Sequence, residues 1–375
     1  MKKIIQSAFL KFIMLFCFLS GTAFAKTAIL YPGEKIKNTF GYPNLVKFIN
    51  ADKNKPLIIF IPGNSHLARI SYGFPGCNQD DFLAYWFHKN GYPFLAISYP
   101  LGNSVFQKNY PSYSIDDWSK SIAEIARQTI EKNNLSKNIV VVAWSMGGEL
   151  AQRINTHAKN KNINIQLFVG LSASTPLYNL KPEGNFFEKL KPNANGLANT
   201  EPFYSFFLKM LDAQNTLNHH VIIPNNLYLS QFVGACPINI MGTALRYHSR
   251  KFVYNLLSAI NDTGAINVND YPSIAIIHGN NVSDLNFTIF GKYDWGSLIV
   301  RHYYKILNTC AKNNSIKLAQ GIQIIKYSPD QLVETVDGTH FFFVGKYGAE
   351  KTTDDIIKMI KVNQKIKNEI KRICD

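Results

Sequence analysis

The chain has 375 residues, of which 46% are hydrophobic and 17% are charged. This composition supports a large buried core and excludes a globally disordered chain. There are 40 Lys and Arg residues against 25 Asp and Glu residues, and the resulting net charge of +15 indicates a basic surface. No Arg-rich tract, aromatic RNA-binding motif or zinc-finger spacing occurs, so no nucleic-acid partner is expected.

The first 25 residues have the organisation of a signal peptide. Lys2 and Lys3 precede an apolar stretch at 8–19, and the small residues Ala23 and Ala25 form a cleavage pattern. The apolar stretch is too short for an ordinary membrane span. We therefore expect cleavage after Ala25, export to the periplasm or beyond the cell, and a soluble mature protein. Its net charge is +12, because three lysines leave with the signal peptide.

Four cysteines remain after this cleavage: Cys77, Cys236, Cys310 and Cys374. An oxidising compartment favours disulfides, either two bridges or one bridge beside two thiols, and three pairings are open. None of the four forms a C-x-x-C pair, so a zinc site is not expected.

Apolar runs and amphipathic segments alternate along the first half of the mature chain. After a β-rich lead-in at about 27–50, the pattern predicts strands at 57–61, 93–99, 138–143 and 165–171, and helices at 81–90, 116–132 and 146–159. Strands that are apolar throughout and separated by helices indicate a mostly parallel sheet flanked by helices.

The alternation stops between about 175 and 270, where Pro, Asn and aromatic residues are frequent and helix-like segments lie near 202–213 and 246–260. It resumes with predicted strands at 274–277, 286–290 and 321–327, a helix at 297–311 and a Lys-rich helix from about 352. We interpret residues 26–174 and 271–375 as one α/β domain, because the sheet needs strands from both sides. Residues 175–270 are then an inserted helical cap.

The third of the buried strands ends in the motif Ala143-Trp144-Ser145-Met146-Gly147-Gly148, and a helix follows directly. A small-x-Ser-x-Gly turn between a strand and a helix is the nucleophile elbow, which lifts the serine oxygen clear of the sheet. The N-terminus of the following helix directs backbone N–H groups towards developing negative charge. The motif therefore predicts a nucleophilic Ser145.

At these residues the chain resembles the α/β-hydrolase family, and the resemblance extends over nearly all of the mature sequence. It rests on the elbow, on Ile61-Pro62-Gly63-Asn64 after an early strand, on Gly291-Lys292-Tyr293-Asp294 after a late strand, and on Gly338-Thr339-His340. Pro62 stands where the family usually carries His. The order Ser, acid, His is that of the family. The resemblance implies that the backbone N–H groups of Asn64 and Met146 hold an oxyanion.

The general base and its acidic partner follow from position in the chain. His340 is the only histidine beyond His302, which falls within a predicted helix, so His340 is expected to be the base. Asp294 is the preferred acid, because it follows the predicted strand at 286–290. Asp284 is the rival if the strand at 274–278 supplies the acid instead, and Asp337 is too near His340 in sequence to be preferred.

The remaining histidines are expected to have other roles. His66 follows the oxyanion loop and is predicted to hydrogen-bond locally, with substrate contact as the alternative. His219 and His220 have no acidic cluster at metal-ligand spacing. No metal and no cofactor is therefore expected.

These features predict an exported serine hydrolase that cleaves carboxylic esters with a hydrophobic acyl part, lipid esters included. A peptidase or amidase, an acyltransferase and a non-catalytic binding protein of the same fold are the alternatives. The aromatic residues of the cap either line an acyl pocket or form the insertion's own core. No obligate protein partner is expected. The basic terminal helix suggests peripheral contact with an anionic membrane, with a solvated helix face as the plainer explanation; its cations are Lys358, Lys361, Lys365, Lys367, Lys371 and Arg372.

Overall fold

The computed structural model describes residues 29–176, 190–285 and 287–375. The predicted signal peptide lies outside these residues. Within the described ranges, no helix combines the length and the apolar character that crossing a membrane requires.

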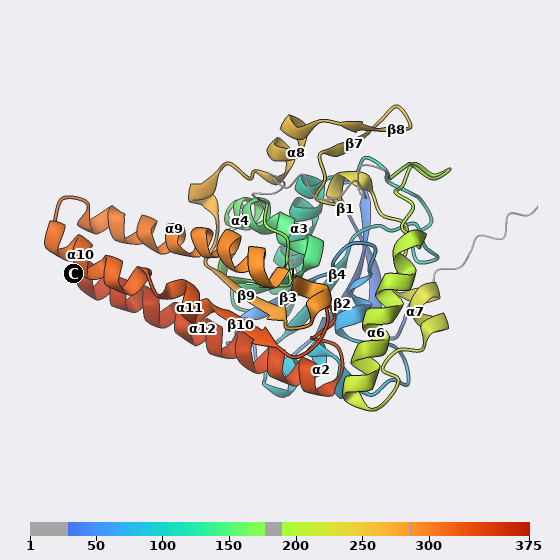
Figure 1. The fold of residues 1–375 in the computed structure, drawn as a ribbon, viewed down its shortest axis with the longest axis horizontal. Coiled ribbons are helices and arrows are strands. Elements are labelled where there is room, and N and C mark those ends of the chain that lie inside the picture. The colour runs from blue at the N-terminus through green and yellow to red at the C-terminus, as the bar shows by residue number, and fades with distance from the viewer. Residues whose placement is uncertain (1–28, 177–189, 286) are drawn as a thin grey trace, which may run out of the picture.

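An eight-stranded sheet forms the centre of the molecule (Figure 1). Its strands lie in the order β1-β2-β4-β3-β5-β6-β9-β10, and all neighbours from β4 to β10 in this order pair in parallel. The strands are β1 (Glu34–Thr39), β2 (Tyr42–Ile49), β3 (Leu57–Ile61), β4 (Phe94–Ser98), β5 (Asn138–Trp144), β6 (Asn164–Leu171), β9 (Ile274–Gly279) and β10 (Val333–Val336). Every residue of β3, β4 and β9 is buried, and apart from Ser98 and His278 near the strand ends their sequences carry no polar side chain.

Helices cover both faces of the sheet. The connection from β3 to β4 runs towards the β1 edge of the sheet, whereas the connections from β4 to β5 and from β5 to β6 run towards the β10 edge. Because parallel crossovers are right-handed, the helix of the first connection and those of the other two lie on opposite faces. On one face α3 (Ile115–Asn133) packs against α4 (Ala151–Lys159). On the other, α2 (Leu83–Lys89) packs against the long helix α12 (Lys346–Cys374). Helix α9 (Lys292–Ala311), which follows β9, packs against β9 and also contacts α12. The helices predicted at 81–90, 116–132 and 297–311 and from 352 are thus confirmed.

The segment between β6 and β9 contains α6 (Tyr204–Asn218), α7 (Asn225–Gln231), a hairpin of β7 (Leu245–His248) and β8 (Lys251–Tyr254), and α8 (Leu256–Thr263). The helix expected near 246–260 is therefore wrong in its first half. Ser249 and Arg250 both have positive φ, the backbone geometry of a tight hairpin turn, which separates two short strands instead.

Two strands predicted in the last third of the chain are also wrong. Residues Phe287–Gly291 form a π-helical turn rather than the strand expected at 286–290, and Asn286 lies outside the described residues. The strand expected at 321–327 overlaps α10 (Ser315–Ile325), which packs on α9 and α12. The last sheet strand is β10, separated from α10 by α11 (Ser328–Leu332).

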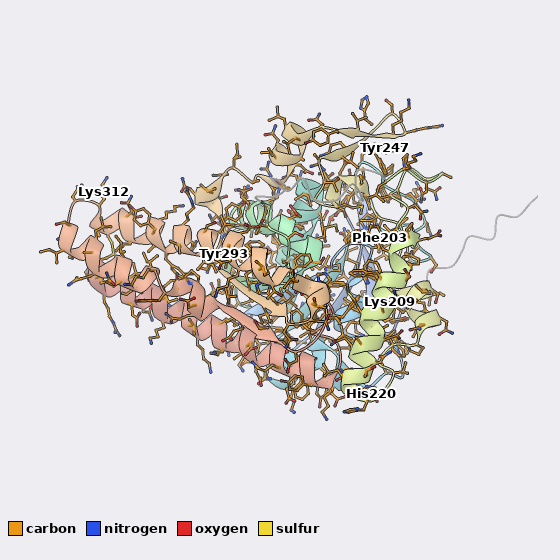
Figure 2. All side chains as sticks on the ribbon, in the orientation of Figure 1. Phe203, Lys209, His220, Tyr247, Tyr293 and Lys312 are labelled. Carbon is orange, nitrogen blue, oxygen red and sulfur yellow. A yellow bond between two sulfur atoms is a disulfide. The ribbon has the colours of Figure 1, made fainter. Side chains whose placement is uncertain are left out.

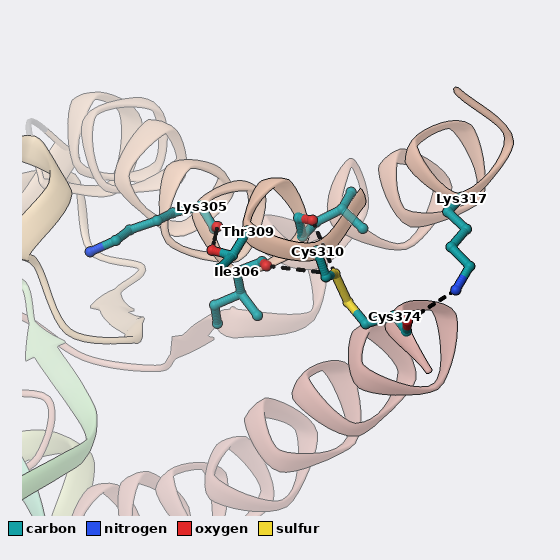
Figure 3. The surroundings of a disulfide bond; sticks show 7 residues. Lys305, Ile306, Thr309, Cys310, Lys317 and Cys374 are labelled. Atoms are coloured by element: carbon teal, nitrogen blue, oxygen red, sulfur yellow. Dashed lines mark hydrogen bonds between the residues drawn. A yellow bond between two sulfur atoms is a disulfide. The ribbon is translucent and has the colours of Figure 1, made fainter. Parts of the chain in front are cut away.

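Cys310 at the end of α9 and Cys374 at the end of α12 form a disulfide (Figure 3). Cys77 and Cys236 are thiols. Of the arrangements left open by the sequence, the structure has one bridge and two thiols.

Candidate active site

Ser145 occupies the turn between β5 and the helical segment Ser145–Leu150. Its φ of 52° lies in the left-handed region, where a residue with a side chain is strained. Trp144, just before it, has an extended backbone, and Ala151 continues into α4. This is the geometry of a nucleophile elbow, which exposes part of Ser145 while its neighbours stay buried.

The turn at Ser145 is possible because glycines surround it. A Cβ on Gly63 would come within 2.8 Å of Ser145 Cβ, and a Cβ on Gly148 would come within 2.1 Å of the Ser174 carbonyl oxygen. Ser174 N–H in turn donates to the Ser145 carbonyl at 3.0 Å. The loop after β3, the elbow and the loop after β6 therefore lie against one another, and the small residues of the elbow motif are explained by close packing.

His340 is buried and bonded to Asp284. The distance from His340 Nδ1 to Asp284 Oδ1 is 2.7 Å, and only 7% of His340 and 1% of Asp284 are exposed. Because a carboxylate can only accept, Nδ1 carries the hydrogen and Nε2 is left as the acceptor. The pair has the arrangement of a general base held by an acid.

The parallel pairing of β9 and β10 brings these two residues together. Gly279 at the end of β9 lies opposite Val336 at the end of β10, so the loops that follow leave the same edge of the sheet. Asn280 N–H donates to the Val336 carbonyl at 3.1 Å, and Asn281 N–H donates to the Gly338 carbonyl at 3.0 Å. Asp284 and His340 are carried by these two cross-linked loops.

Two further side chains orient the pair, and sequence reasoning missed both. Ser172, the first residue after β6, donates its hydroxyl hydrogen to Asp284 Oδ2. Trp144 Nε1–H donates to the His340 carbonyl at 3.0 Å, which ties the base to the residue next to Ser145. The position of Ser172 directly after a sheet strand, beside the elbow strand, was the only signal for its role.

The structure does not bring Asp294 to His340, contrary to the preference stated from the sequence. Asp294 lies exposed in the first turn of α9, whereas the acid on His340 Nδ1 is Asp284. The preference depended on a strand at 286–290, and that segment is a π-helical turn. Asp284, the rival, is the carboxylate that contacts His340, because β9 is the strand next to β10. Asp337 instead lies against Asn280, whose side-chain amide donates to it.

The loop after β3 carries Asn64 beside the elbow, and His66 fixes its conformation. His66 is fully buried; its Nδ1 lies 2.6 Å from the Asn64 carbonyl oxygen and its Nε2 lies 2.6 Å from the Tyr228 hydroxyl. A carbonyl only accepts, so Nδ1–H donates to it and Nε2 accepts from Tyr228. Burial lowers the pKa of His66 to about 3, so the ring is neutral. The local hydrogen bonding predicted for His66 is present, with a partner from α7.

Helix α6, in the segment between β6 and β9, lies against the residues around His340 and His66. Phe207 packs its ring against His66 and Phe341, with ring centroids 4.9 and 6.4 Å apart. Gln214 accepts from Thr339 N–H at 3.1 Å and donates to the Val344 carbonyl at 3.0 Å, so α6 is fastened to both sides of His340. Figure 2 shows α6 along this side of the molecule, with Phe203, Lys209 and His220 spaced along or just beyond it.

The other histidines singled out in the sequence lie in hydrogen-bonded positions. His220 Nε2 is 2.7 Å from Asp81 Oδ2, and this carboxylate raises the pKa of His220. His302 bonds through Nε2 to Ser273 Oγ at 2.8 Å. In the part of the chain that the structure describes, no group of three or more His, Cys, Asp or Glu side chains has the geometry of a metal site.

Comparison with known proteins places the fold. No protein-family model and no curated protein matches the sequence. Among solved structures, a thermophilic esterase from Thermogutta terrifontis matches with a TM-score of 0.50 and 10% identity over 88% of this chain and 98% of the esterase. A soluble variant of monoglyceride lipase from Saccharomyces cerevisiae matches with a TM-score of 0.43 and 12% identity, over 92% of this chain and 96% of the lipase. An AqdC variant that cleaves the ring of the Pseudomonas quinolone signal matches with a TM-score of 0.48 and 11% identity, over 88% of this chain and 99% of the AqdC chain. With the sheet order and the elbow described above, the esterase match shows that this chain has the α/β-hydrolase fold.

Proposed function

We propose that the protein is a serine hydrolase that cleaves carboxylic esters, with Ser145 as nucleophile, His340 as general base and Asp284 as the acid that orients it. The observation that carries the proposal is the buried pair of His340 and Asp284. Trp144, the residue just before the strained Ser145, holds this pair by donating to the His340 carbonyl. Nucleophile, base and orienting acid are the three roles that this reaction needs.

In the first half of the reaction, Ser145 Oγ attacks the ester carbonyl carbon while its proton passes to His340 Nε2. The Asp284 carboxylate holds Nδ1–H at 2.7 Å, which keeps Nε2 free to accept and stabilises the imidazolium that forms. The C–O bond to the alcohol then breaks, and the alcohol leaves with the proton from Nε2.

In the second half, water attacks the acyl group on Ser145 and gives its proton to His340 Nε2. The bond between Ser145 Oγ and the acyl carbon breaks, Oγ recovers the proton, and the carboxylic acid leaves. The Ser145 proton leaves with the alcohol and a proton from water replaces it, so Ser145 and His340 end the cycle in their starting states, with no redox step.

The oxyanion formed in each half is held by the backbone N–H groups of Asn64 and Met146. Two facts support this assignment: Met146 lies in the first turn of the helical segment Ser145–Leu150, and Gly63 brings the Asn64 loop into contact with Ser145. Fixed N–H donors stabilise the developing charge without reorganisation. His66 contributes by holding the Asn64 carbonyl, and thus the orientation of the adjoining peptide groups.

Aromatic side chains around the pair favour an ester with a hydrophobic acyl part. His340 packs against Trp144 and Phe287 at ring-centroid distances of 5.4 and 4.8 Å, and Phe207 of α6 closes over His66. Export by a signal peptide at residues 1–25, and a cap at residues 175–270, remain part of the proposal.

The first experiment labels the purified protein with a fluorophosphonate probe and assays p-nitrophenyl esters of graded chain length. Wild type and Ser230→Ala, a change at an exposed serine, should label and turn over, whereas Ser145→Ala should do neither. A well-folded Ser145→Ala protein that retains the wild-type rate would end the proposal. Parallel assays with p-nitroanilides and with added alcohols separate an esterase from an amidase and from an acyltransferase.

A further inference from the structure

Three helices form an arm that projects from the body of the molecule. Figure 1 shows the outer parts of α9 and α12, together with α10, extending beyond the sheet, with the C-terminus at the outer end. The main packing partners of α10 are α9 and α12, so it belongs to the arm and not to the core around the sheet. We define the arm as residues 300–327 and 361–375.

The arm has its own core and is fastened at its outer end. Leu307, Ala311, Ile325, Ile366 and Ile370 are buried. At the outer end the Cys310–Cys374 disulfide joins α9 to α12, and Lys317 Nζ of α10 donates to the Cys374 carbonyl at 2.9 Å (Figure 3). The arm therefore presents a fixed surface.

Most of the protein's excess positive charge lies on this arm. It contains eight lysines, two arginines and two acidic residues, a net charge of +8 in 43 residues, and residues 300–327 contain no acid at all. The rest of residues 29–375 has 26 Lys and Arg against 23 Asp and Glu. Lys312 lies at the far end of the arm in Figure 2. The basic character noted in the sequence is thus the property of one structural element.

Cations on α12 border an open groove of about 530 Å³. Lys361, Lys365 and Arg372 line it, together with Gln166, Ile360, Gln364, Asn368 and Glu369. Amide groups and three cations are suited to phosphate oxygens. Glu369 lies 3.8 Å from Lys365 in an exposed pair, which reduces this charge only in part.

The arm also exposes aliphatic side chains among its cations. Ile316 and Ile322 of α10 are 71% and 41% exposed. They lie between Lys312 and Lys326 in a helix without acidic residues. Exposed apolar residues flanked by lysines are typical of helices that lie in the interface of an anionic bilayer. The arm also exposes Tyr304 and Tyr327, whose side chains suit a membrane interface as well as a nucleic-acid base, so binding to a DNA duplex is tested beside binding to vesicles.

We propose that the arm is a docking surface for a bilayer of anionic phospholipids. The lysines supply attraction to the headgroups, and Ile316 and Ile322 enter the interface. The site around Ser145 is on other elements of the fold, so docking is independent of the proposed hydrolysis. A surface held by the disulfide loses little conformational freedom on binding, because its three helices are already fixed.

The test is sedimentation with vesicles, using the Ser145→Ala protein so that lipid esters are not consumed. Vesicles of phosphatidylcholine are compared with vesicles of equal parts phosphatidylcholine and phosphatidylglycerol, at 50 and 500 mM NaCl. We expect binding to the anionic vesicles alone, at least tenfold weaker at high salt. Equal binding to both compositions would overturn the proposal.

Charge and apolar contact are separated with two variants. Replacing Lys312, Lys326, Lys365 and Lys371 with Gln should weaken binding to anionic vesicles at least tenfold. The matched control replaces exposed lysines of the body, Lys35, Lys53, Lys108 and Lys132, and should bind within twofold of the parent. Ile316→Ser with Ile322→Ser should weaken binding severalfold at unchanged charge. If the arm and control variants weaken binding equally, or if the protein binds a DNA duplex through these lysines and not the vesicles, the proposal is wrong.

Discussion

Asp284 and His340 are 56 residues apart in the chain, yet Asp284 Oδ1 accepts the Nδ1 hydrogen of His340 at 2.7 Å inside a nearly solvent-free site. The contact depends on the parallel pairing of β9 with β10, which carries both loops to one edge of the sheet. If the proposed reaction is correct, this bond sets the tautomer of the base.

The first prediction therefore concerns Asp284→Asn. An amide in place of the carboxylate no longer stabilises the imidazolium and favours the wrong tautomer, so kcat for a p-nitrophenyl ester should fall by about 10³- to 10⁴-fold with little change in KM. Asp294→Asn is the matched control, because this residue is exposed on α9, and it should stay within about twofold of wild type. A large loss in the control and none in Asp284→Asn would return the acid to Asp294.

The second prediction tests whether α7 positions the loop after β3, which carries the proposed oxyanion donor Asn64. Tyr228→Phe removes the hydroxyl that donates to His66 Nε2 and leaves a buried acceptor unpaired, at a cost of about 1–3 kcal/mol. We expect a three- to tenfold lower kcat with KM nearly unchanged, measured by steady-state kinetics. Tyr254→Phe, at an exposed position of β8, should have no effect. Equal kcat values in the two variants would restrict Tyr228 to a structural role.

The third prediction is a loss of stability as the pH falls below about 6.5. Burial lowers the pKa of His66 to about 3 and those of His278 and His302 to about 4, so all three are neutral when folded. In the unfolded chain they take up protons near pH 6.5, which favours unfolding. Together these three groups should lower the free energy of unfolding by about 4 kcal/mol between pH 7.5 and 5.5, before most carboxylates titrate. Glu149, whose pKa is raised by burial, acts in the opposite direction over this range, so the change is measured in the Glu149→Gln protein.

Urea unfolding at several pH values measures this change. His278→Leu removes one of the three groups, and because neither ring nitrogen of His278 has a hydrogen-bond partner among the described residues, the substitution breaks no hydrogen bond there. The decrease between pH 7.5 and 5.5 should become about one third smaller. A pH dependence that His278→Leu leaves unchanged would contradict the neutral, buried state of this histidine.

The fourth prediction concerns Glu149, one helical turn beyond Ser145. The side chain is fully buried and neither carboxylate oxygen has a hydrogen-bond partner among the described residues, so burial raises the pKa of Glu149 well above its ordinary value. Above pH 4.5 the unfolded chain releases this proton and the folded chain keeps it, which costs stability as the pH rises.

Glu149→Gln removes that cost without changing the shape of the side chain. The variant should be more stable than wild type by at least about 1 kcal/mol at pH 8, with the difference disappearing near pH 4. Glu350→Gln, on α12, is the control and should differ little at either pH. Destabilisation by Glu149→Gln at pH 8 would show that the carboxylate is ionised and stabilised in the folded protein.

The fifth prediction concerns the disulfide that closes the arm. Cys310→Ser with Cys374→Ser opens a loop of 64 residues and should lower the free energy of unfolding by about 2–4 kcal/mol. Ester hydrolysis should remain within about twofold, because the arm lies apart from Ser145. Cys77→Ser, at a thiol, is the comparison in urea unfolding. A loss of activity that tracks the double substitution would place the arm in the proposed site.

The sequence by itself determined the features that depend on short stretches of chain. β3, β4, β5 and β6 were predicted from continuous apolar runs, because strands buried on both faces need apolar residues at every position. The elbow was found because a tight strand-to-helix turn needs small residues at fixed spacing around Ser145. The position of His340 followed from its place near the end of the chain.

The tertiary structure alone decided which carboxylate meets His340 and where the positive charge gathers. Asn-Phe-Thr-Ile-Phe alternates like a strand, but Phe287–Gly291 is helical and β9 pairs with β10, so Asp284 is the partner. The apolar run at 321–327 overlaps α10 because α9 and α12 cover its apolar side. Strand pairing and helix packing join residues far apart in sequence, and such contacts leave no periodicity in the local pattern to reveal them.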